Sequence, residues 1–75
     1  MHELYAKDEI KVAMADMNFR FWKDEFDRQA MLLKVYASDE YIDRFGEHDA
    51  VDCLEKIRCA QSMMQHYKEQ KELWS

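Results

Sequence analysis

The side chains best suited to chemistry in this sequence are thiols, imidazoles and carboxylates at helical spacing. Cys59, Met63 and His66 step along one side of a predicted helix, with donors that suit a soft metal ion. A second candidate set consists of His48, Asp49, Asp52 and Cys53. Neither set has the paired-cysteine spacing of a zinc site, and each needs further ligands from another segment. We therefore predict no metal site and no cofactor, with Cys59 and Met63 filling gaps beside the core and His66 exposed.

Carboxylates are concentrated in the middle of the chain. Residues 38–55 contain seven acids and one base, a net charge of −6, whereas the whole chain carries −5. The acidity therefore belongs to one segment, and two explanations stay open. Acids are favoured at helix starts, and an acidic surface can also dock a basic partner, including a protein surface that otherwise binds phosphates. For docking, the residues that we predict to contact the partner are Asp39, Glu40, Asp43, Glu47 and Asp49.

The charge balance argues against direct nucleic-acid binding, which usually needs a basic face or a recognisable motif. The basic residues near the C-terminus alternate with glutamates and are typical of solvated pairs within a helix. A helix-turn-helix is the nearest candidate motif, but its second helix would open with acids that repel phosphate. The alternative function is a transcriptional regulator that contacts DNA through the C-terminal helix, using Arg58, Lys68 and Lys71.

Catalysis has weaker support than binding. The three serines, at positions 38, 62 and 75, stand in no catalytic motif, and Gly46 alone cannot build a phosphate-binding loop. A chain of two long helices offers little concave surface in which a nucleophile and a base can meet. We predict that the protein is not an enzyme.

These groups are positioned by two long predicted helices, the first from about Asp8 to Ala37. A single glycine and no proline in the chain make an all-β fold very unfavourable. The first helix has an apolar stripe at steps of three and four residues, comprising Val12, Ala15, Phe19, Trp22, Phe26, Leu33 and Tyr36, with Gln29 its one polar member. A second apolar set, Ile10, Met14, Met17 and Phe21, predicts that the first half is buried on two sides.

A break is predicted near Ala37. Ser38 is followed by two acids, and a hydroxyl with acids behind it is typical of a helix start. Gly46 suits the left-handed residue that closes a short helix through Phe45, and Asp49 is expected to cap the next helix. One uninterrupted, kinked helix is the alternative that the sequence leaves open.

The second long helix is predicted from Ala50 to near Leu73. Its stripe comprises Ala50, Cys53, Leu54, Ile57, Ala60, Met64 and Tyr67. These side chains are mostly small or unbranched, and they suit antiparallel packing against the large side chains of the first helix. The residues that we predict to form the core or a dimer interface are Phe19, Trp22, Phe26, Leu33, Ile57 and Met64.

The predicted fold is all-α, a helical hairpin of a long helix, a short connecting helix and a second long helix, forming one domain over residues 1–75. A chain this short buries only about 60 % of its unfolded surface, so its core is marginal. The ends of the hairpin add apolar residues, namely Met1, Leu4, Tyr5, Leu73 and Trp74. We therefore predict a homodimer that forms a four-helix bundle.

The predicted location is the cytoplasm. The N-terminus lacks a basic region followed by an apolar run, so neither a signal peptide nor a membrane span is expected. Cys53 and Cys59 lie roughly 9 Å apart along one predicted helix and are expected to stay reduced. The predicted function is a small acidic protein–protein interaction module, an adaptor, modulator or inhibitor of another macromolecule. Such chains are frequent among phage and bacterial accessory proteins.

Overall fold

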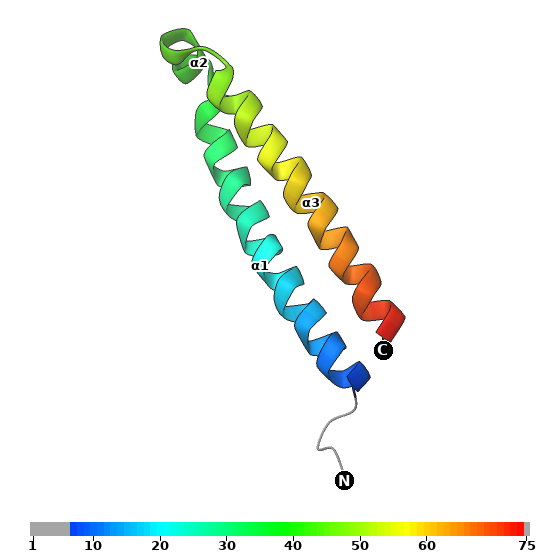
Figure 1. Cartoon of the computed structure of the whole chain (residues 1–75). Helices are drawn as coiled ribbons and strands as arrows, with labels where there is room; N and C mark the ends of the chain where they lie inside the picture. Colours follow the sequence, from blue (N-terminus) through cyan, green and yellow to red (C-terminus); the bar gives the residue numbers. More distant parts are fainter. Residues whose placement is uncertain (1–6, 75) are drawn as a thin grey trace.

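The structure, a computed structural model, describes residues 7–74 and places almost all of them in three helices. These are α1 (Lys7–Tyr36), α2 (Asp39–Phe45) and α3 (His48–Trp74). The helices α1 and α3 run antiparallel side by side, and α2 lies at the end where they are joined (Figure 1). No strand occurs within residues 7–74. The predicted all-α hairpin with a short connecting helix is confirmed.

Ser38 separates α1 from α2. Its backbone is extended (φ −68°, ψ 147°), and its hydroxyl oxygen accepts a hydrogen bond from the Tyr41 N–H at 3.3 Å. The same hydroxyl donates to the main-chain oxygen of Val35 at 2.7 Å. One side chain thus ends α1 and begins α2, which excludes the single kinked helix.

Gly46 ends α2. Its φ of 78° lies in the region that disfavours a Cβ, and its N–H donates to the main-chain oxygen of Ile42 at 2.8 Å. The positive φ agrees with the prediction. The ψ of −177° is not that of the predicted left-handed helical residue, because the backbone continues in an extended conformation toward α3.

The start of α3 differs from the prediction. The helix begins at His48, and Asp49 lies inside its first turn rather than before it. The prediction that Asp49 caps the start of α3 is therefore wrong. Its carboxylate instead accepts a hydrogen bond from the Tyr41 hydroxyl, which holds α2 against the start of α3.

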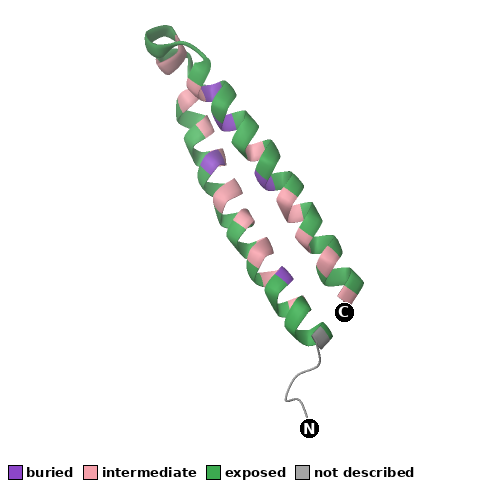
Figure 2. Ribbon diagram, in the orientation of Figure 1, coloured by how far each residue is buried: buried purple, intermediate pink, exposed green. Residues whose placement is uncertain are grey.

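The core is a narrow seam between α1 and α3, in which the buried apolar side chains among residues 7–74 are small. Ala60 is completely buried, Cys53 is 2 % exposed and Ala50 is 7 % exposed. The buried positions follow the inner sides of the two helices (Figure 2). The six predicted core or dimer-interface residues are all half-buried, namely Phe19, Trp22, Phe26, Leu33, Ile57 and Met64. Leu54 is exposed, although the predicted stripe includes it, because Cys53 occupies the inward position beside it.

Candidate interaction surfaces

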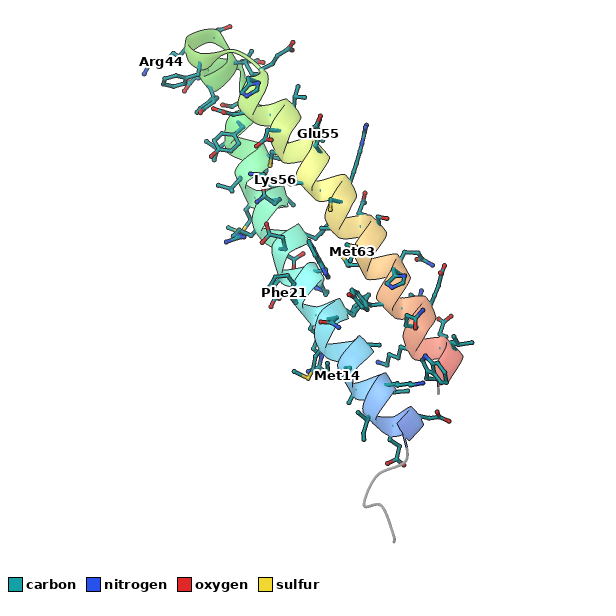
Figure 3. All side chains as sticks on the ribbon, in the orientation of Figure 1. Met14, Phe21, Arg44, Glu55, Lys56 and Met63 are labelled. Atoms are coloured by element: carbon teal, nitrogen blue, oxygen red, sulfur yellow. The ribbon has the colours of Figure 1, made fainter. Side chains whose placement is uncertain are left out.

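An exposed apolar row runs along α1 outside its contact with α3, and its first two members, Ile10 and Met14, also border a hollow between the two helices. The outer row consists of Ile10, Met14, Met17, Phe21, Met31 and Val35, each at least 53 % exposed. Spacings of three and four residues place all six on one side of a helix. Met14 and Phe21 project away from α3 (Figure 3). α1 therefore has two apolar sides, and α3 covers one of them.

The outer row is unusual for a single chain. Isolated exposed apolar residues are common on monomers, whereas several large ones gathered on one side of a helix mark an interaction surface. The sequence indicated its first four members, but Met31 and Val35 were missed. The same spacing reaches them, with two charged residues in between, so following the period through those residues finds the complete row.

The predicted partner-binding acids gather at one end of the molecule. Asp39, Glu40 and Asp43 lie on α2, Glu47 lies in the following turn, and Asp49 lies in the first turn of α3. We call these five residues the acidic end. The first four are exposed and Asp49 is half-buried. Within residues 7–74, none of the first four forms an ion pair, so their charges face solvent.

Tyr41 anchors the acidic end. Its hydrogen bond to Asp49, with some loss of solvation, raises the pKa of Tyr41 to about 12. Its ring also contacts those of Tyr36 and Phe45, with centroids 5.1 and 4.7 Å away. α2 therefore has a fixed position relative to both long helices, and its carboxylates form a defined surface.

The set of His48, Asp49, Asp52 and Cys53 does not form a cluster that could hold a metal ion. Within residues 7–74, no three side chains of His, Cys, Asp or Glu are close enough to hold a metal ion. Cys53 is buried and its thiol is hydrogen-bonded to Gln29, whereas His66 is exposed. Cys59 is exposed as well, so the prediction that it fills a gap beside the core is wrong. The neighbouring Ala60 takes the inward position instead.

Comparison with protein-family models, curated proteins and solved structures found no match. No helix within residues 7–74 is long and apolar enough to cross a membrane.

The basic residues proposed for DNA contact lie on α3. Arg58 and Lys68 are exposed. The Lys71 ammonium donates to Asp16 Oδ1 at 2.9 Å, and Arg20 pairs with the same carboxylate at 3.0 Å. The hydrogen bond from Lys71, with the nearby Arg20 charge, lowers the pKa of Asp16 despite partial desolvation. Lys71 therefore links the end of α3 to α1, a contact between distant residues that sequence reasoning missed.

A second missed contact closes the open end of the hairpin. The Lys11 ammonium lies over the Trp74 ring, 3.6 Å from its centroid. Trp74 is half-buried, whereas Leu73 is 68 % exposed. Met1, Leu4 and Tyr5, predicted to add apolar surface at this end, lie outside the described residues.

Proposed function

We propose that this protein is a small interaction module that dimerises through the outer row of α1 and docks a basic partner protein with its acidic end. The observation that carries the proposal is the outer row, six large apolar side chains exposed on the side of α1 away from the core. Removing such a row from water contributes about 25 cal/mol per Å² of apolar surface. A macromolecular partner is the natural means of covering a row that runs along most of a helix.

The proposed dimer contains four long helices. Because the outer row lies away from α3, two chains joined there form a layer of four helices with the two α1 helices in the middle, in place of the predicted bundle around one core. A homodimer interface buries the same surface on both chains, and the methionines and aromatic ring of the row suit an interface core.

The acidic end supplies the second surface. Asp39, Glu40 and Asp43 are exposed and project from a helix held at both ends. A concentrated negative field steers and orients a basic protein surface, which suits an adaptor, modulator or inhibitor. Both cysteines are free thiols, which favours a reducing compartment such as the cytoplasm.

The molar mass in solution tests the dimer. Light scattering over a range of protein concentrations should give twice the mass of one chain. Met17→Glu, at a position 65 % exposed on the outer row, should give the mass of a monomer. Leu73→Glu, at a position 68 % exposed on α3, is the matched control and should remain dimeric. A wild-type protein that is monomeric throughout contradicts the proposed dimer.

Capture of a partner tests the acidic end. A triple variant, Asp39→Asn, Glu40→Gln and Asp43→Asn, should keep its helicity and lose a partner that the wild type captures from extracts of its native host. The control triple, Asp8→Asn, Glu9→Gln and Glu69→Gln, makes the same change in net charge outside residues 38–55 and should keep that partner. Equal capture by both triple variants contradicts docking at the acidic end.

A further inference from the structure

Two charged residues interrupt the outer row at positions that continue its spacing of three and four residues. Asp24 and Arg28 occupy the two positions between Phe21 and Met31, so the spacing of four and three residues continues from Ile10 to Val35. Both side chains are exposed. Arg28 pairs with Glu25 in its own helix, whereas Asp24 forms no ion pair within residues 7–74. Any chain that covers the row must therefore meet one acid and one base near its middle.

A second copy in the antiparallel direction satisfies both charges. When Asp24 of each copy lies opposite Arg28 of the other, Phe21 lies opposite Met31 and Met17 lies opposite Val35. Over residues 17–35, charged groups then meet opposite charges and apolar groups meet apolar groups, whereas Ile10 and Met14 lie outside the paired part of the row. A parallel pair places Asp24 against Asp24 and Arg28 against Arg28. An antiparallel pair shifted by seven residues places Phe21 against Asp24.

The acidic ends favour the same direction. Residues 38–55 carry a net charge of −6 at the end of the hairpin formed by α2. A parallel dimer holds two such ends side by side, where like charges repel. An antiparallel dimer separates them to opposite ends of the assembly.

We propose that a second copy of this chain packs antiparallel on the outer row, with Asp24 of each copy against Arg28 of the other. The pairing rests on the proposed dimer and gives it a direction and a register. Residues 17–35 of the two chains overlap over about 27 Å. The two acidic ends face opposite directions, so the dimer presents two separate docking surfaces and can bridge two basic partners.

Charge reversal tests the register through the dissociation constant of the dimer, measured by analytical ultracentrifugation. Arg28→Asp and Asp24→Arg each create like-charge contacts and should raise this constant at least about tenfold. The double variant restores opposite charges across the antiparallel interface and should return within about threefold of wild type. A parallel dimer has like charges before and after each change, so it predicts no such loss and recovery.

A control separates the interface from the helix itself, because Arg28→Asp also removes the Arg28–Glu25 pair within α1. Lys23→Asp disrupts the Lys23–Asp27 pair, at a position away from the outer row. It should leave the dissociation constant within about threefold of wild type. If the single reversals at positions 24 and 28 change the dissociation constant no more than Lys23→Asp does, the proposed register is overturned.

Disulfide trapping tests the direction without relying on charge. In a Cys59→Ser background, Met17→Cys and Val35→Cys chains should form an interchain disulfide only when they are mixed. Met17→Cys chains that cross-link to themselves indicate a parallel dimer and overturn this inference, while the proposed dimer stands. A protein that is monomeric in every assay overturns both the proposed dimer and its antiparallel direction. Docking at the acidic end is tested by the capture experiment alone.

Discussion

The thiol of Cys53 on α3 contacts Gln29 on α1 twice, with its sulfur 2.9 Å from the main-chain oxygen and 3.3 Å from Oε1. Gln29 is the one buried polar residue within residues 7–74. Its amide nitrogen also donates to Glu25 Oε1 at 3.0 Å. A buried polar group favours the helix register in which it finds partners. This contact therefore helps to set the position of α3 along α1.

Loss of this thiol should destabilise the hairpin. Cys53→Ala removes a buried sulfur and both of its contacts, and we expect it to lower the free energy of unfolding by about 1–2 kcal/mol. Cys59→Ala, at an exposed position on the same helix, should change it by less than about 0.5 kcal/mol. Urea unfolding followed by circular dichroism at one fixed protein concentration measures both. Equal losses in the two variants contradict a structural role for Cys53.

The two thiols should differ in reactivity. Burial raises the pKa of the Cys53 thiol. Solvent hardly reaches the Cys53 sulfur, whereas Cys59 is exposed. Because the thiolate is the nucleophile, an aromatic disulfide reagent should modify one thiol quickly in the native protein. The second should react only after a denaturant is added. Peptide mapping should locate the fast site at Cys59, and rapid native labelling of Cys53 contradicts its burial.

Features that depend on neighbouring residues were predictable from the sequence. The break at Ser38 follows from a hydroxyl ahead of two acids, and the positive φ at Gly46 follows from the one residue without a Cβ. The sides on which α1 and α3 pack against each other follow from two periodic stripes. Each of these signals is contained within a few residues or one helical repeat.

Features that depend on how one helix is rotated against the other were not predictable. Leu54 and Cys59 are exposed because Cys53 and Ala60 face α1 instead, and a rotation of α3 by one residue in either direction changes which neighbour faces α1. The role of Asp49 depends on Tyr41, eight residues earlier, being brought back against it. Local sequence marks these residues as polar or apolar without fixing their partners.

Enlarging the smallest core position should destabilise the fold. Ala60 is completely buried, so Ala60→Leu adds three carbon atoms where the helices leave no room. We expect a loss of about 1–3 kcal/mol in the free energy of unfolding. Ser62→Leu, two residues along α3 at an exposed site, adds an apolar side chain without crowding the seam. Its thermal unfolding should resemble that of wild type, and an Ala60→Leu protein equally stable to wild type contradicts close packing at the seam.

The Tyr41–Asp49 hydrogen bond should make stability depend on alkaline pH. The pKa of Tyr41 is about 12 in the folded protein, against 10.0 for an unperturbed tyrosine. The folded state therefore holds this proton more tightly than the unfolded state. The resulting stabilisation is complete below pH 10.0 and is lost as pH rises from there to about 12.

Tyr41→Phe removes both the titrating hydroxyl and the contact with Asp49. The variant should be less stable than wild type at neutral pH, and the difference should shrink as pH rises through the same interval, because only the wild type loses this contribution. Unfolding in urea at a series of pH values measures the difference. Tyr67→Phe on α3 controls for general effects of alkali on tyrosine variants. A Tyr41→Phe difference that stays constant with pH shows that the hydrogen bond does not hold α2 against α3.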